Sequence, residues 1–300
     1  MVAKELEFNS EVIEKRLQKI YVKDPKQVIL FAARCAMRVL PFLVVDSAVN
    51  YWQINNSDEK VKYLTAVWLC AITAYSAFID GLSQKTDQKY HASELLIAVV
   101  DSAHSAFLNA TAKLSVFRAT SDYAFNAVYF TYFLAKEVSF PRKNNGYRIM
   151  LSVMDAATAA YNASQASLEY QQVFVEQLYA DLNTIENGSS LTLDQALFDS
   201  ADVPEFYQYQ QQWSNALSRL ASEYSKSELD SRSSFLLAID EAYVEIVNGK
   251  YDFNNLEEWF DIDESSQIEG ERRQKTFIEY RYQASDLLRE GIQGDDALNR

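Results

Sequence analysis

Two histidines and two carboxylates share one expected helix, and their side chains are of the types that bind metals. They form the patterns H-x-x-E and D-x-x-H, and at about 100° per residue they lie within an arc of roughly 140°. Metal sites in four-helix bundles take a Glu-x-x-His motif from each of two helices, whereas these pairs lie about 10 Å apart on one helix. We therefore expect ordinary surface or hydrogen-bonding roles, with a metal or small-ligand site as the alternative, for His91, Glu94, Asp101 and His104.

A second group of interest lies in residues 252–264 (DFNNLEEWFDIDE), which contain six acidic side chains, no basic one and several large apolar ones. As a helix this segment would present an apolar stripe with a negative rim. It would either dock on the protein itself or anchor a basic partner through aromatic hot spots and electrostatic steering. The predicted partner-binding residues are Phe253, Leu256, Glu257, Glu258, Trp259, Phe260 and Asp261.

A third group consists of aspartates beside or inside apolar helical stretches: Asp46, Asp80, Asp101 and Asp155. A buried carboxylate destabilises a protein strongly unless it is paired. We expect intramolecular ion pairs, and the alternative is a polar groove that binds a ligand. The expected basic partners are Arg34, Arg38, Arg118 and Arg148.

Common catalytic motifs are missing from the sequence. It lacks the phosphate-binding patterns G-x-x-x-x-G-K-[ST] and G-x-G-x-x-G, the zinc-protease pattern H-E-x-x-H and the nucleophile elbow G-x-S-x-G. Neither histidine follows an arginine at a spacing of five, as in some helical nucleases, and no paired Cys/His clusters indicate structural zinc. We expect no cofactor and favour a non-enzymatic role.

Helices must position all of these residues. The chain has 7 Gly and 4 Pro, where average usage gives roughly 21 and 15, so long helices with short connections are expected. Asp24-Pro25-Lys26-Gln27 predicts a helix start with an N-cap, a first-turn proline and a capping-box glutamine. The expected helices span about 25–51, 57–81, 90–118, 121–140, 147–185, 203–224, 227–248, 254–262 and 268–300.

Alanines recur at helical spacing in the first part of the chain, for example Ala156, Ala157, Ala160 and Ala163. Small residues at this spacing allow helix axes to approach closely. The predicted fold is therefore all-α: an antiparallel array of long Ala-rich helices, either a bundle or a short solenoid, followed by an acidic helical subdomain.

Charge divides the chain at Asn187-Gly188-Ser189-Ser190, the clearest linker. Residues 1–185 contain 18 basic and 18 acidic side chains, whereas residues 186–300 contain 10 basic and 24 acidic ones. We predict two domains, the Ala-rich array over 1–186 and the acidic subdomain over 187–300. A net charge of −14 argues against direct binding of nucleic acid, because phosphates would be repelled.

The expected location is the cytoplasm. Cys35 and Cys70 lie inside apolar helical runs and are expected to be buried free thiols. Residues 1–20 carry charges throughout and have no apolar core, which excludes a signal peptide. The uncharged run 63–79 is a little shorter than the ~20 residues that span a bilayer, so we expect a buried core helix and no membrane association.

The run from Ala32 to Pro41 (AARCAMRVLP), with the alanine-rich helices after it, resembles helical regions in uncharacterised bacterial proteins that accompany antiphage or conflict-system effectors. Pro204, Trp213, Leu217, Leu220 and the run Phe235–Gly249 are similar in layout to a later segment of those regions, but most of its tryptophans are missing here. The similarity covers most of residues 30–250. It implies a bacterial cytoplasmic protein with a defence context, and it implies no catalytic residues.

These observations favour a non-enzymatic helical scaffold or adaptor that binds another protein, one with a basic surface, through its acidic C-terminal part. Self-association into a homo-oligomer is compatible with them. Two alternatives stay open: a metal- or small-ligand-binding protein or enzyme that uses the face with His91, Glu94, Asp101 and His104, and an acidic inhibitor that mimics nucleic acid.

Overall fold

The computed structural model describes residues 6–44, 120–139, 146–198, 204–224 and 230–253, together with eleven single positions between 60 and 78. Every regular element in this part of the chain is a helix. The all-α prediction is therefore confirmed for the described residues. The single positions between 60 and 78 are all helical, as predicted for 57–81.

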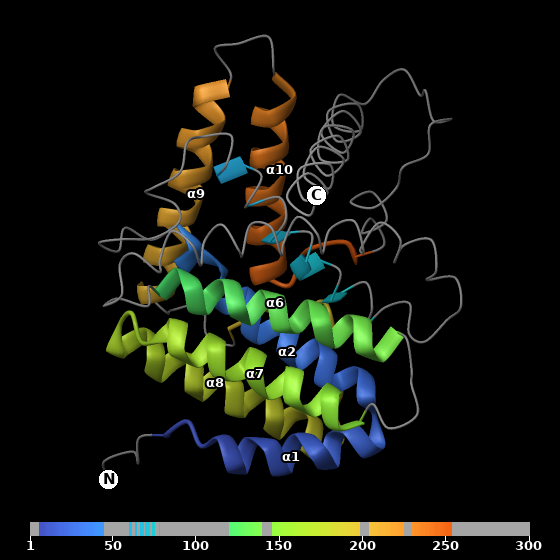
Figure 1. Ribbon diagram of the computed structural model, residues 1–300. Helices are drawn as coiled ribbons and strands as arrows, with labels where there is room; N and C mark the ends of the chain where they lie inside the picture. Colours follow the sequence, from blue (N-terminus) through green and yellow to red (C-terminus); the bar gives the residue numbers. More distant parts are fainter. Residues whose placement is uncertain are drawn as a thin grey trace, which may run out of the picture.

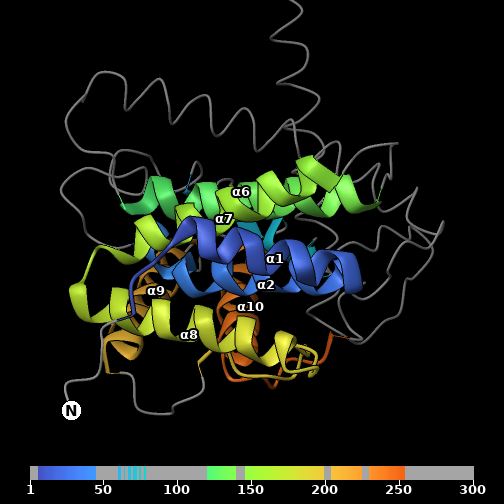
Figure 2. The ribbon, with the colours of Figure 1, turned by 90° about the horizontal axis from the view of Figure 1, so that it is seen from below.

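Five helices run side by side and two stand steeply against them (Figure 1). The first set contains α1 (Ser10–Lys23), α2 (Pro25–Val39), α6 (Thr120–Ser139), α7 (Gly146–Ser164) and α8 (Leu168–Glu186). The second contains α9 (Pro204–Tyr224) and α10 (Asp230–Val247). Figure 2, from below, shows the first five still lying along one direction, with α9 and α10 behind them.

One aspartate makes the corner between α1 and α2. The backbone N–H of Asp24 donates to the carbonyl of Ile20 at 2.8 Å and so ends α1, while its carboxylate accepts from the N–H of Lys26 at 3.0 Å and so begins α2. The predicted N-cap is confirmed. The predicted capping box is wrong, because the side chain of Gln27 bonds to Leu191, far along the chain, instead of turning back to Asp24.

Two predicted helices end early, each for a local reason. The helix expected to reach Tyr51 ends at Val39 and continues as the 3-10 helix η1 (Leu40–Leu43), since Pro41 has no N–H to continue the α-helical pattern. The helix expected over 147–185 is two helices, because Ser167 caps α8 by accepting from the N–H of Tyr170 at 3.2 Å. Folding α8 back in this way brings its polar face to α2.

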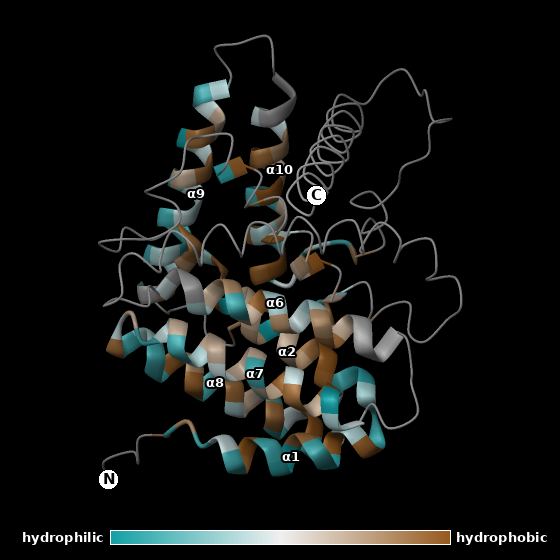
Figure 3. Cartoon of the chain, viewed as in Figure 1, coloured by the Kyte–Doolittle hydropathy of each residue, from teal (hydrophilic) through white to brown (hydrophobic). Residues whose placement is uncertain are grey.

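Buried alanines occur on both α6 and α7. On α7 the predicted stripe of Ala156, Ala157, Ala160 and Ala163 is fully buried, and α6 contributes Ala124 and Ala127. In Figure 3, α2 is mainly hydrophobic, whereas α1 contains mostly hydrophilic residues. Among the described helices, none is long and apolar enough to cross a membrane.

The end of α10 lies against the loop 191–198. Gly249 has a φ of +65°, and the N–H of Lys250 donates to the carbonyl of Glu245 at 2.8 Å, as in a glycine C-cap. A Cβ at Gly249 would lie 2.3 Å from the carbonyl oxygen of Asp194. Two features therefore require glycine at position 249: the left-handed backbone and the close approach of the loop.

Replacing Gly249 with alanine tests this contact. We expect Gly249→Ala to lower the free energy of unfolding by about 2–4 kcal/mol, because backbone strain and overpacking add together. Gly188→Ala is the matched control, since Gly188 has a φ of +85° but a Cβ added there would have no atom within 4 Å. The control should lose only about 1 kcal/mol. Urea denaturation followed by circular dichroism measures both, and equal losses would contradict the role of the loop contact.

Candidate functional site

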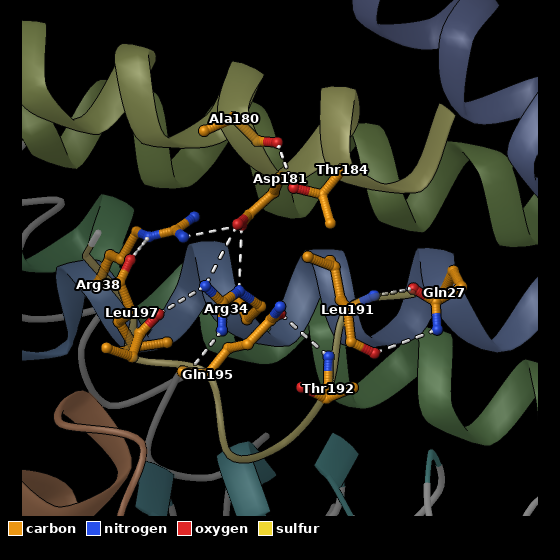
Figure 4. A network of polar contacts seen from close by, with 11 residues as sticks. Gln27, Arg34, Arg38, Ala180, Asp181, Thr184, Leu191, Thr192, Gln195 and Leu197 are labelled. Atoms are coloured by element: carbon orange, nitrogen blue, oxygen red, sulfur yellow. Dashed lines mark hydrogen bonds and ion pairs between the residues drawn. The ribbon is translucent and has the colours of Figure 1, made fainter. Parts of the chain in front are cut away.

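The main polar cluster of the described structure lies on one stripe of α2 (Figure 4). Its three residues, Gln27, Arg34 and Arg38, are separated by seven and four positions, which places them within an arc of about 40°. All three are buried, with exposed fractions of 4%, 2% and 0%. This stripe faces α8 and the loop 191–198, and it joins these two segments to α2.

Asp181 of α8 is the counter-ion of both arginines. Its carboxylate accepts from Nε and Nη2 of Arg34 at 3.1 and 3.2 Å and lies 2.7 Å from Nη2 of Arg38. Burial lowers the pKa of the Arg38 guanidinium, but the combined effects of Asp181, Cys35 and Tyr170 outweigh burial, and the pKa lies above its ordinary value. One carboxylate thus contacts both buried guanidinium groups.

Three consecutive backbone carbonyls accept further hydrogen bonds from the arginines. Arg34 donates to Gln195 at 3.0 Å and to Ala196 at 2.8 Å, and Arg38 donates to Leu197 at 2.8 Å. The guanidinium of Arg38 also lies 5.7 Å from the ring centroid of Phe198, at cation–π distance. The carbonyl dipoles thus supply the negative potential that one carboxylate alone does not provide for two cations.

Two tyrosines cap the carboxyl end of α2, where the last carbonyls have no helical partners. The hydroxyl of Tyr170 donates to the carbonyl of Arg38, and that of Tyr243 donates to the carbonyl of Met37 at 3.4 Å. Burial raises the pKa of both hydroxyls, so they remain protonated donors. The helix end is therefore satisfied by side chains from α8 and α10.

Cys35 is a potential nucleophile beside this cluster. Burial raises the pKa of its thiol from 9.0 to about 12, and attraction to Arg38 offsets only part of that effect. Catalysis by cysteine requires the thiolate, which this environment suppresses. Tyr75, also next to the arginines, has a pKa raised by burial. The chemistry of the cluster is therefore structural: it orders α2, α8 and the loop.

The aspartate that pairs with the buried arginines is not one of the four aspartates predicted from the sequence. Arg34 and Arg38 do form buried ion pairs, but with Asp181, which was not among the predicted aspartates. Asp155 is partly buried on α7, and burial raises the pKa of its carboxyl. Two sequence features signal this pairing. Residues 27, 34 and 38 form a polar stripe on one apolar helix, and Asp181 lies among the buried, mostly apolar residues of another. Asp46, Asp80, Asp101 and Arg118 lie outside the described residues.

Of the residues predicted to bind a partner, the structure describes Phe253. Its ring stacks on Tyr75 with centroids 5.2 Å apart and an interplanar angle of 22°, and Tyr251 packs edge-on against it at 4.9 Å. Phe253 therefore contacts the helical body. Outside the described residues lie Leu256, Glu257, Glu258, Trp259, Phe260 and Asp261, and also His91, Glu94, Asp101 and His104. Within the described ranges, no group of three or more metal-binding side chains occurs.

Neutralising Asp181 should lower the free energy of unfolding far more than neutralising a surface carboxylate does. We expect Asp181→Asn to lower the free energy of unfolding by about 3–5 kcal/mol, because two buried cations lose their counter-ion. The control is Glu186→Gln, which removes the more exposed ion pair with Arg16, at 2.7 Å, and should cost less than about 1 kcal/mol. Urea denaturation compares the two variants, and losses of similar size would show that the buried pair is not special.

The Cys35 thiol should resist alkylation while the chain is folded. Burial raises the pKa of this thiol to about 12 in the folded state, whereas an unfolded thiol has a pKa of about 8.5. We expect iodoacetamide at about pH 8 to leave Cys35 unmodified in the native protein and to modify it fully in guanidinium chloride. Peptide mass spectrometry locates the label. Rapid modification of the folded chain at Cys35 would contradict the structural assignment.

Comparison of the chain with protein-family models, with curated proteins and with solved structures found no match. Proposals about function therefore depend on the residues and contacts described above. These contacts join α2, α8, α10 and the loop 191–198, and Phe253 is the last residue that the structure describes.

Proposed function

We propose that this chain is a non-enzymatic scaffold or adaptor whose helical body presents the acidic residues 254–264 to a basic protein partner. The observation that carries the proposal is the attachment of Phe253 to Tyr75. It gives the acidic segment a fixed point of departure from a packed core. A recognition segment anchored in this way loses less conformational entropy on binding than a free tail.

The use of charge within the body supports the same function. Arg34, Arg38 and Asp181 are buried and joined to one another and to backbone carbonyls, so their charges serve folding. The acidic excess lies instead in residues 186–300, with 24 acidic and 10 basic side chains. A negatively charged region steers a basic partner and sets a salt-dependent association rate.

The apolar residues of the segment would supply the affinity. Leu256, Trp259 and Phe260 are spaced i, i+3 and i+4, the pattern of one helix face that enters a groove. Large aromatic residues at the centre of an interface contribute most of the binding energy. The resemblance of residues 30–250 to helical regions in bacterial conflict systems makes an antiphage defence complex the setting that we propose.

Neutralising the acidic residues should release the partner. The full-length chain and the variant Glu257→Gln/Glu258→Gln/Asp261→Asn serve as baits in a bacterial lysate, and the proteins captured are identified by mass spectrometry. We expect at least one basic protein to bind the wild type, to bind the variant about tenfold less well, and to lose affinity as salt rises.

The matched control is Glu176→Gln/Asp194→Asn/Glu223→Gln, which removes the same charge from exposed positions on α8, the loop 191–198 and α9. It should retain the partner. Equal retention by both variants, or an affinity indifferent to salt, would contradict recognition through the acidic segment.

A further inference from the structure

The outward face of α1 combines lysines with exposed valines. Val12 and Val22 are 43% and 83% exposed, and Lys15, Lys19 and Lys23 are exposed as well. These five residues, which we call the basic surface, lie within an arc of about 100° on the helix. The opposite side of α1 carries the buried residues Ile13, Leu17 and Ile20. The valines are therefore not part of the core, and a hydrophobic β-branched residue gains nothing from contact with water.

Positive charge is concentrated at this place. Residues 15–26 contain five basic side chains and one carboxylate. That carboxylate, Asp24, caps α2, and Arg16 turns to α8, where it bonds to Asn183 and Glu186 at 2.7 Å. Lys19 and Lys23 form no ion pair within the described part of the chain. The carboxyl-terminal half of α1 thus presents lysines without a salt-bridge partner in the described part of the chain, whereas the exposed carboxylates of Glu11 and Glu14 lie nearer the start of the helix.

We propose that the basic surface binds the acidic segment 254–264 of a second copy of this chain. This inference rests on the proposed function, in which that segment is the recognition element. The two surfaces are complementary: one offers lysines around Val12 and Val22, and the other offers carboxylates around Leu256, Trp259 and Phe260. Opposite charges around apolar centres give both orientation and affinity.

The position of Phe253 favours a second copy over the same one. Phe253 stacks on Tyr75 and follows α10, which lies on the other side of α2 from α1 in Figure 1. As a helix, the segment 254–264 spans only about 16 Å, and it would have to pass around the layer of α2, α7 and α8. A neighbouring molecule has no such restriction. The resulting head-to-tail contact is heterologous, so it builds rings or open chains.

Charge exchange between two variants tests this pairing. In sedimentation velocity at low salt, the full-length chain should self-associate. Lys19→Glu/Lys23→Glu and Glu257→Lys/Glu258→Lys should each associate about tenfold more weakly alone, and their mixture should recover association because each supplies what the other lacks. Recovery in the mixture also demonstrates that both variants are folded. The single variant Lys19→Glu is compared with a control, Arg219→Glu, which makes the same change of charge on the exposed side of α9. The control should not weaken association.

Cross-linking identifies the residues and the molecules involved. Carbodiimide treatment of mixed ¹⁴N- and ¹⁵N-labelled chains should join Lys19 or Lys23 to a carboxylate of residues 257–264 in mixed-isotope pairs. Same-isotope pairs alone, or no such cross-link, would overturn the proposal, as would a mixture of variants that stays monomeric.

A vesicle experiment tests lipid as the alternative occupant of the basic surface. If the wild type, but not Lys19→Glu/Lys23→Glu, sediments with phosphatidylserine vesicles, the surface binds lipid and the proposal is overturned. Retention of the basic partner by Lys19→Glu/Lys23→Glu separates this result from the proposed function.

Discussion

Two buried guanidinium groups that share one carboxylate constrain the described structure more than any other contact. Arg34 and Arg38 require negative charge or dipoles close by, because an unpaired buried cation is very unfavourable. Asp181 meets part of this requirement, and the carbonyls of Gln195, Ala196 and Leu197 contribute to it as well. Three segments that are far apart in sequence, α2, α8 and the loop 191–198, must therefore be in place together. Such a network favours one arrangement of the helices over alternatives that apolar packing alone would permit.

The loop 191–198 transmits this constraint to the last helices. Its first residue, Leu191, exchanges two hydrogen bonds with the side chain of Gln27, and its Leu197 N–H donates to the carbonyl of Val247 at 2.9 Å. Gly249 lets α10 approach the loop, and Tyr243 on α10 reaches back to the end of α2. Through these contacts Phe253, the last described residue, is placed against Tyr75. The start of the acidic segment is thus linked to the buried arginines by a continuous series of contacts.

Charge has two separate uses in this molecule. Inside, it is paired and desolvated and serves to order the helices. Along the sequence it is segregated: residues 186–300 contain 24 acidic and 10 basic side chains, and the lysines at positions 15, 19 and 23 are exposed on α1. Exposed charges at a distance from one another contribute little to stability but direct association. This separation is the physical basis for assigning recognition to the surface and the terminal segment, and stability to the interior.

Much of the secondary structure was predictable from local chemistry. Scarce Gly and Pro, the Asp24-Pro25 corner, the alanine stripe of α7 and the Gly249 stop each act within a few residues of themselves. Two further local signals are present: Asn9 caps α1 ahead of Ile13, Leu17 and Ile20, and Ser167 divides α7 from α8. The pairing of Arg34 and Arg38 with Asp181 could not be predicted in this way, since residues so far apart in the chain meet only after the helices fold back. Sequence by itself thus determined where helices form and where charge gathers. Tertiary structure decided which charges are neutralised inside, because that depends on distance in space, and periodicity along one helix contains no information about its neighbours.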